Sequence, residues 1–375
     1  MELGQGAVES LVVSTLPVLP ELPTAAFWRN KRVLLTGHTG FKGAWCALWL
    51  TRLGAHVIGV ALPPTGRNSL YELARLDRDI DSRMCDVRDS AAIKALLGEC
   101  RPEIVIHMAA QALVRNSYLE PLETYGTNVM GTVNLMDGAR HCRSVRAVVM
   151  VTSDKCYENR EWDRPYSEGD ALGGHDPYSS SKACAEIAIA AWRRSYFSGV
   201  GALGLASVRA GNVIGGGDWA VDRLIPDCMR AFVADKPVVL RRPTAIRPWQ
   251  HVLEPLRGYL ILAERLSDAP KRFAEAWNFG PAQEDARTVL GVATRAADLW
   301  GSGARCETAN ESPPHEATIL RLDTGKAATR LGWRPRLDLS RGLEWAVEWY
   351  RRVDRGEDAK SVTFAQIEAF ERLFS

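Results

Sequence analysis

The sequence has few of the features that mark membrane or nucleic-acid-binding proteins. Its 375 residues contain no apolar run near the ~20 residues that a transmembrane helix requires, so we expect no membrane partner. Lysine and arginine are spread along the chain without basic runs, and the formal net charge is only +2. We therefore expect no nucleic-acid partner. With 46% hydrophobic and 25% charged residues, the composition is that of an ordinary globular protein.

Paired cysteines and clustered histidines are also missing. The eight cysteines form no CxxC pair, and most stand within apolar segments. This indicates buried thiols without disulfides in a reducing compartment, so we expect a cytoplasmic protein. The seven histidines are scattered, with no HxxxH pattern and no His/Cys cluster, so we expect no metal site.

An apolar segment near the N-terminus, residues 11–20, does not have the form of a signal peptide. No lysine or arginine precedes Arg29, and prolines at 17, 20 and 23 interrupt any helix. Residues 1–26 are therefore predicted to be an N-terminal extension that lies on the surface or is disordered.

Residues 33–43, VLLTGHTGFKG, have the pattern of a phosphate-binding turn. An apolar strand is followed by Gly37, Gly40 and Gly43 and then by an apolar helical run at 44–53. Glycines let the chain turn tightly and let backbone N–H groups approach a pyrophosphate. The pattern alone also fits an ordinary strand-to-helix turn, but a second strand at 56–60 completes a βαβ unit and favours dinucleotide binding.

Strands and helices alternate from residue 30 to about residue 206, which predicts an α/β fold with a doubly wound parallel sheet of the Rossmann type. Further strands are expected at 84–89, 104–108, 147–151, 208–214, 238–240 and 276–280, and helices at 90–97, 120–142, 176–197 and 256–266. We assign residues 27–207 to a dinucleotide-binding domain, with residues 246–280 returning to it. Residues 208–245 and 281–360 are predicted to form a smaller, interleaved substrate domain.

The second strand lacks the acidic residue that usually holds the adenine ribose of NAD. Ala61, Leu62 and two prolines stand there instead. Arg67 is near enough in sequence to face a 2′-phosphate, although a loop arginine is more often only solvated. The sequence leaves the choice between NAD and NADP open.

Two polar clusters are candidates for catalysis. The strand at 147–151 leads into Ser153, Asp154 and Lys155, at the sheet edge where ligands bind in such folds. One helix later, Tyr178 and Lys182 are four residues apart and share one helix face, so the ammonium group can stabilise a phenolate. A YxxxK pattern alone is more often a surface tyrosine with a solvated lysine; its position after the strand cluster favours catalysis.

With these pieces placed, the chain resembles the extended short-chain dehydrogenase/reductase superfamily and, more narrowly, the CDP-glucose 4,6-dehydratases. The resemblance extends from about residue 28 to residue 350. It rests on GHTGFKG (37–43), HMAAQALVRNSY (107–118), TNVMGT (127–132), TSDKCYEN (152–159), DPYSSSK (176–182), VRAGNVIGGGDWAVDRLIPD (208–227) and IRPWQHVLEP (246–255).

The resemblance implies oxidation of the sugar at C4 by NAD, loss of water across C5 and C6, and return of the hydride to C6. Tyr178 would take the C4 hydroxyl proton, and Lys182 would lower the pKa of Tyr178 and hold the nicotinamide ribose. Ser153 would hydrogen-bond the C4 oxygen. Asp154 would protonate the departing C6 hydroxyl, and Lys155 stands where related dTDP-glucose dehydratases have a glutamate as the C5 base.

The same matching implies the binding residues. For NAD they are Gly37, His38, Gly40, Phe41, Lys42, Gly43, Asp86, Val87, Ala109, Ala110, Gln111, Asn128, Tyr178 and Lys182. For the substrate, CDP-glucose, they are Asn212, Arg223, Leu224, Arg247, Gln250, His251, Asn278 and His315.

Two other functions stay open. An NAD-dependent 4-epimerase of nucleotide sugars needs Tyr178 and Lys182 but has no use for Asp154 and Lys155. A non-catalytic NAD(P)-binding regulator would be expected to have a broken Tyr/Lys pair. The helices at 120–142 and 176–197 are more apolar than one buried stripe requires, and the resemblance implies that they pair across a two-fold axis as a four-helix bundle in a homodimer.

Overall fold

The computed structural model describes residues 21–64, 66, 68–199, 201–285, 287–309 and 320–374. Most of the predicted N-terminal extension, Arg67 and the predicted substrate residue His315 lie outside these ranges. The last residues of the predicted extension contact the fold. Helix α1 (Ala25–Trp28) buries Trp28, and the backbone N–H of Thr24 donates to the carboxylate of Glu264 at 2.7 Å. The division into two domains stays a prediction.

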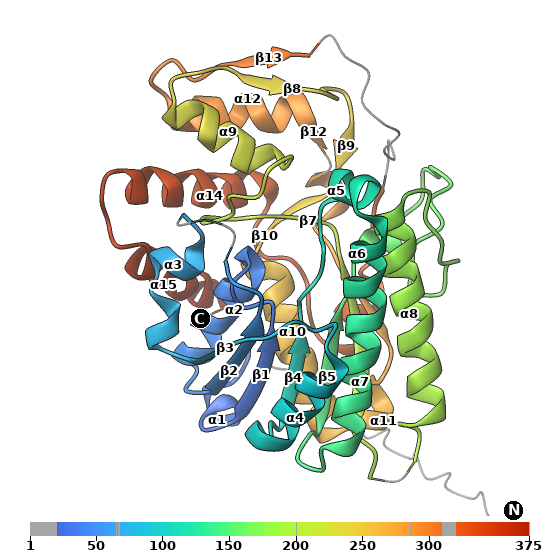
Figure 1. Ribbon diagram of the computed structural model, residues 1–375. Coiled ribbons are helices and arrows are strands. Elements are labelled where there is room, and N and C mark those ends of the chain that lie inside the picture. Colours follow the sequence, from blue (N-terminus) through green and yellow to red (C-terminus); the bar gives the residue numbers. More distant parts are fainter. Residues whose placement is uncertain are drawn as a thin grey trace, which may run out of the picture.

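A seven-stranded sheet forms the centre of the molecule, in the order β11-β6-β5-β4-β1-β2-β3, and all of its pairings are parallel (Figure 1). Its strands are β1 (Arg32–Thr36), β2 (His56–Ala61), β3 (Asp81–Met84), β4 (Ile104–His107), β5 (Ala147–Val151), β6 (Gly204–Ala210) and β11 (Ala276–Phe279). This sheet confirms the predicted doubly wound α/β fold.

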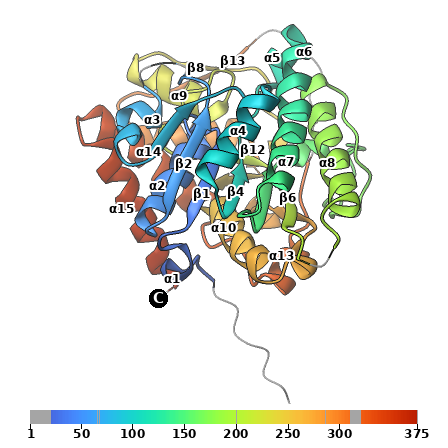
Figure 2. The same ribbon diagram turned by 60° about the horizontal axis from the view of Figure 1, so that its bottom comes forward.

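Helices cover both faces of this sheet, as Figures 1 and 2 show. One face packs against α2 (Phe41–Arg52) and α10 (Leu253–Asp268), and the other against α4 (Ser90–Cys100), α7 (Gly131–His141) and α8 (Pro177–Ser195). Neighbouring strand residues point to opposite faces: Leu35 packs in the core that contains Leu256 of α10, and Leu34 in the core that contains Leu135 and Ile189. Burial on both faces explains why most of the strands are largely apolar, whereas the edge strand β3 (DSRM) is mostly polar and exposed.

The remaining elements lie mostly above the carboxyl edge of the sheet in Figure 1 or along its side. The small strands are β7 (Asn212–Ile214), β8 (Val238–Leu240), β9 (Ile246–Arg247), β10 (Trp249–His251), β12 (Arg287–Thr288) and β13 (Cys306–Thr308). The other helices are α3 (Leu70–Leu73), α5 (Val114–Leu119), α6 (Pro121–Tyr125), α9 (Leu224–Val233), α11 (Pro270–Phe273), α12 (Val289–Trp300), α13 (Gly325–Arg330), α14 (Leu339–Asp354) and α15 (Ala359–Glu371).

Three predicted elements differ from the observed ones. The strand expected at 208–214 is two strands, because the chain leaves the main sheet at Gly211 and β7 pairs with β10 instead. The strand expected at 84–89 is β3, which ends at Met84 and leaves Asp86 in the loop after it. The helix expected at 120–142 is α6, a π-helical turn (Gly126–Met130) and α7 in succession.

All eight cysteines are free thiols, as expected, but only Cys46, Cys156 and Cys228 are fully buried, and Cys184 is exposed. The expectation that most are buried is therefore only partly right. Among the described residues, we find no helix that is both long and apolar enough to cross a membrane.

Candidate active site

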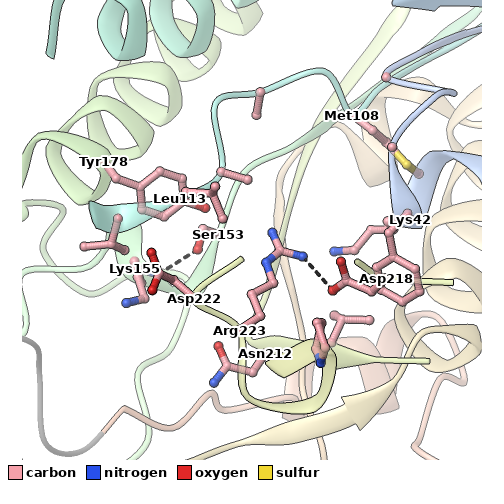
Figure 3. Close-up of a pocket in the computed structure, with 18 of the residues that line it drawn as sticks. Lys42, Met108, Leu113, Ser153, Lys155, Tyr178, Asn212, Asp218, Asp222 and Arg223 are labelled. Carbon is pink, nitrogen blue, oxygen red and sulfur yellow. Dashed lines mark hydrogen bonds and ion pairs between the residues drawn. The ribbon is translucent and has the colours of Figure 1, made fainter. Parts of the chain in front are cut away.

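A cavity of about 640 Å³ opens at the carboxyl edge of the main sheet. Its lower wall consists of the loops that follow β1, β2, β4 and β5, and its upper wall includes residues of α9 and β8. Figure 3 shows that side chains from both walls converge on it, with Arg223 lying between Ser153 and Asp218. The predicted residues that line the cavity are Gly37, Gly40, Phe41, Lys42, Gly43, Asp86, Val87, Ala109, Ala110, Ser153, Asp154, Lys155, Tyr178, Lys182, Asn212, Arg223, Leu224 and Arg247.

The glycine turn is shaped for close approach of a phosphate. Gly37 has a φ of +78°, a conformation that favours glycine, and a Cβ there would lie 2.8 Å from the backbone nitrogen of Ala109. A Cβ at Gly43 would collide with the carbonyl oxygen of Gly37. Gly40 is the N-cap of α2 and offers no side chain to the first N–H groups of that helix, so they can donate to an anion. The turn fits the pyrophosphate of a dinucleotide.

The far end of the lower wall has the features of an adenosine site without a ribose-binding acid. Asp86 and Val87 line it, and the Asp86 carboxylate accepts from Arg88 at 2.6 Å, which lowers its pKa. Leu62, after β2, uses its carbonyl to accept from Thr39 at 3.0 Å.

Ser153 and Asp154 contact each other next to helix α8. The Ser153 hydroxyl donates to Asp154 Oδ1 at 3.0 Å, and its oxygen accepts from the backbone N–H of Lys155 at 3.2 Å. Asp154 is only 4% exposed, and burial raises the pKa of its carboxyl above the usual value. A buried carboxyl with a raised pKa is suited to deliver a proton.

Tyr178 is placed by the start of α8. Asp176 caps this helix by accepting from the Ser179 N–H at 2.9 Å, and the Tyr178 N–H donates to Ser117 at 3.1 Å. Burial raises the pKa of Tyr178 to about 12, against the opposite effect of a hydrogen bond with Ser153. That Lys182 lowers this pKa stays a prediction; in this structure desolvation is the largest effect on the pKa of Tyr178.

Two lysines, the buried Lys182 and the half-buried Lys42, add positive charge to the cavity. Lys182 is 4% exposed, and its ammonium group lies 3.5 Å from the carbonyl oxygen of Val151. Burial lowers the pKa of Lys182 to about 8. Burial also lowers the pKa of Lys42 to about 8, helped by the charges of Arg223 and Lys182. These cations can stabilise an oxyanion or a phosphate.

Similarity to known proteins agrees with this geometry. The family model described as GDP-mannose 4,6 dehydratase matches residues 34–345. A CDP-glucose 4,6-dehydratase from Salmonella typhimurium is 52% identical over 336 residues, which cover 88% of this chain and 94% of that protein. The chain belongs to the nucleotide-sugar 4,6-dehydratase family. This membership confirms the resemblance that the motifs predicted.

Solved structures share the fold of this dehydratase at lower identity. A UDP-glucose 4-epimerase with UDP-glucose from Thermotoga maritima superposes with a TM-score of 0.76 at 22% identity, covering 86% of this chain and 99% of that one. A UDP-glucose 4-epimerase complex with NAD from Thermus thermophilus has a TM-score of 0.71 at 24% identity, covering 85% and 99%. At these identities the likeness shows the fold alone.

Three predicted cofactor residues of this dehydratase do not line the cavity. His38 lies under β2, where its Nε2 is 2.8 Å from the Ser82 hydroxyl, and burial lowers its pKa to about 4. Asn128 and Gln111 bind each other: the Gln111 N–H donates to Asn128 Oδ1 at 2.9 Å, and Asn128 Nδ2 donates to the Gln111 carbonyl at 3.0 Å. Their placement supports a bracing role rather than contact with a ligand.

Three predicted substrate residues also lie outside the cavity. Gln250 is 2% exposed and donates from its amide to the Phe279 carbonyl at 2.8 Å. His251 packs edge-on against two tryptophans, and burial lowers its pKa to about 3. Asn278 accepts from the Tyr157 hydroxyl at 2.7 Å and donates to two backbone carbonyls. Because all three side chains are buried and do not line the cavity, this placement does not support the expected contact with a substrate.

Several charged residues that line the upper part of the cavity were not predicted from the sequence, namely Arg115, Asp218, Asp222, Asp227 and Arg241. Asp218 accepts from Arg223 at 3.0 Å, and Asp222 joins Arg115 of α5 to Arg241 beyond β8. The three aspartates all lie in the motif at 208–227, so their spacing within that motif was the signal available.

Proposed function

We propose that this chain converts CDP-glucose to CDP-4-keto-6-deoxyglucose, with NAD as a bound cofactor that is not consumed. The observation that carries the proposal is the contact of Asp154 with Ser153 in the cavity that also receives Tyr178 and Lys182. An acid next to the site of C4 oxidation can protonate a departing hydroxyl group, and a simple epimerisation contains no such step. The 52% identity to a CDP-glucose 4,6-dehydratase supports the choice of cytidine nucleotide.

In the proposed reaction Tyr178 accepts the proton of the C4 hydroxyl while Ser153 holds the C4 oxygen. When bound, NAD supplies the oxidation at C4 and its later reversal at C6. The C4 ketone makes the C5 proton acidic, and Lys155 is proposed to remove it. Asp154 then gives its proton to the C6 hydroxyl, which departs as water. Lys155 would return its proton to C5 as hydride returns to C6, and proton exchange with solvent would restore Tyr178 and Asp154, so one water leaves and no cofactor is used up.

The residues proposed to hold NAD are the glycine turn at 37–43, Asp86, Val87, Ala109 and Ala110, and Lys182 is proposed to hold the nicotinamide ribose. The bound cofactor's positively charged ring would lower the pKa of Tyr178 toward the working range, because a nearby cation favours the phenolate. Asn212, Arg223 and Arg247 are proposed to hold the substrate diphosphate, and Leu224 the base.

The proposed assembly is a homodimer in the cytoplasm. Exposed apolar side chains gather on neighbouring elements: Leu122 of α6 is 87% exposed, Ile187 of α8 is 56% exposed and Met130 is 52% exposed. Leu135 and Met136 of α7 are buried in the core of the same subunit. Burial of the exposed group against a second copy would form the predicted four-helix bundle. Light scattering that shows a monomer at micromolar concentration would contradict it.

One assay tests the activity directly. The purified protein is incubated with CDP-glucose and NAD, and the products are separated and identified. We expect a 4-keto-6-deoxy sugar nucleotide without net NADH. An equilibrium mixture of two epimers would instead favour the epimerase. No turnover despite bound nucleotide sugar would favour a regulator.

A further inference from the structure

The upper end of the cavity is an apolar slot between α9 and β8. Leu224 and Pro226 of α9 form one side, and Val239 and Leu240 of β8 with Ala245 form the other. Figure 1 shows α9 lying directly below β8. Arg223 and Arg247 line the same cavity as this slot and the catalytic residues. An apolar slot in a cavity that also holds two cations fits a flat nucleobase joined to a diphosphate.

Among the carboxylates of the upper cavity, Asp227 is the one that belongs to α9. Asp227 lines the cavity and follows Leu224 by three residues, so the two side chains share one face of α9. Arg230 donates to Asp227 Oδ1, and Arg230 is itself anchored by donating to the Trp219 carbonyl at 2.7 Å and to the Ala220 carbonyl at 3.2 Å. The carboxylate is therefore held in a fixed position.

The second oxygen of this carboxylate is available to a ligand. Over the described part of the chain, the Arg230 contact is the only hydrogen bond to the Asp227 side chain, and it uses Oδ1. The neighbouring Arg241 is engaged with Asp222. Burial raises the pKa of Asp227, so this group is partly desolvated and gains from a donor that it meets there.

We propose that Asp227 accepts a hydrogen bond from the exocyclic amino group of cytosine and thereby sets the preference of this enzyme for cytidine nucleotides. Cytosine carries an N–H donor at the position where uracil and thymine carry a carbonyl oxygen. A carboxylate pairs with the amino group and repels the carbonyl oxygen. The inference rests on the proposed function, because it takes the nucleoside diphosphate end of that substrate as the occupant of the slot.

The test is the substitution Asp227→Asn, which removes the negative charge and puts an amide donor in place of one acceptor oxygen. The wild type and the variant are compared by kcat/KM for CDP-glucose and for UDP-glucose, and by calorimetric Kd values for CDP and UDP. We expect the preference for cytidine over uridine to fall at least about tenfold in both measurements, since one base contact of this kind is worth ~1–3 kcal/mol. The change should appear in KM and Kd more than in kcat.

The matched control makes the same aspartate-to-asparagine substitution at a position outside the cavity. Asp235 follows α9, is exposed and does not line the cavity, so Asp235→Asn should keep the wild-type preference. If Asp227→Asn does not fold, Asp227→Ala removes the same repulsion and should also relax the preference. An unchanged ratio of CDP to UDP affinity in a folded variant would overturn the inference. If the wild type itself fails to dehydrate CDP-glucose, the proposed function fails instead, and the two failures are distinguishable.

Discussion

Thr152 donates a hydrogen bond from its hydroxyl to the carboxylate of Glu186 at 2.5 Å. Thr152 directly precedes Ser153, and Glu186 follows Lys182 by one turn of α8, so this bond ties the end of β5 to the helix that carries Tyr178 and Lys182. Glu186 also accepts from Ser207 and Arg209, each at 2.8 Å. The distance between the serine and the tyrosine of the active site thus depends on a buried carboxylate outside it.

Glu186→Gln should destabilise the protein strongly. Glu186 and Arg209 are 2% and 3% exposed, and the substitution leaves the Arg209 guanidinium buried without its counter-charge. Breaking such a pair costs about 3–5 kcal/mol. Glu344→Gln is the control, because its ion pair with Arg295 is exposed and worth about 1 kcal/mol or less. Denaturant unfolding of both variants measures the difference, and equal losses would contradict the argument.

Tyr178→Phe should keep nucleotide-sugar binding and lose turnover by at least about 100-fold, the usual contribution of a positioned base. The ring still packs, but it offers no acceptor for the C4 hydroxyl proton. Calorimetry with CDP-glucose and steady-state kinetics separate the two effects. A variant that turns over near the wild-type rate would exclude Tyr178 as the base.

Asp154→Asn should slow one step of the reaction and leave the step before it intact. Oxidation at C4 does not use this carboxyl, whereas departure of the C6 hydroxyl does, so we expect elimination to slow by about 100-fold while oxidation continues. Single-turnover absorbance should then show reduced cofactor accumulating. Loss of that signal together with turnover would mean that Asp154 serves oxidation as well.

The sequence predicted best what depends on short segments. The glycine turn and the parallel strands follow from residue types at fixed spacing, and the structure has them. Side-chain direction was harder to predict: within β10, Trp249 lines the cavity while the adjacent Gln250 and His251 are buried away from it. A matched motif does not say which way each residue points, because that depends on packing against elements far along the chain.

The pKa values of the site residues are also hard to predict from the sequence. Nothing local predicts that Tyr178 has a raised pKa, since the desolvation that raises it comes from the assembled cavity. Asp227 was also missed, because its relation to Leu224 matters only once α9 borders the cavity.

Cofactor occupancy should depend on the residues at the end of β2. Ala61 and Leu62 line the cavity where we propose that adenosine binds, and neither can accept from a ribose hydroxyl through its side chain. We therefore expect NAD to be held loosely, so that purified protein is partly empty and gains activity when NAD is added. Leu62→Asp should lower the Kd for NAD, measured by fluorescence titration. Cofactor that stays fully bound through gel filtration of the wild type would contradict this prediction.

The burial of Glu264 should make stability depend on pH. Glu264 is 5% exposed and accepts from the Thr24 N–H, and burial raises its pKa from 4.5 to about 7. Between these two values the folded protein binds a proton that the unfolded chain has lost, so the contribution of this group to stability falls as pH rises through that window. Glu264→Gln keeps an acceptor for Thr24 but cannot ionise. From about pH 5 to about pH 8 the wild type should lose more unfolding free energy than this variant, with Glu344→Gln following the wild type. Parallel pH profiles for the wild type and Glu264→Gln would show that Glu264 does not titrate in this range.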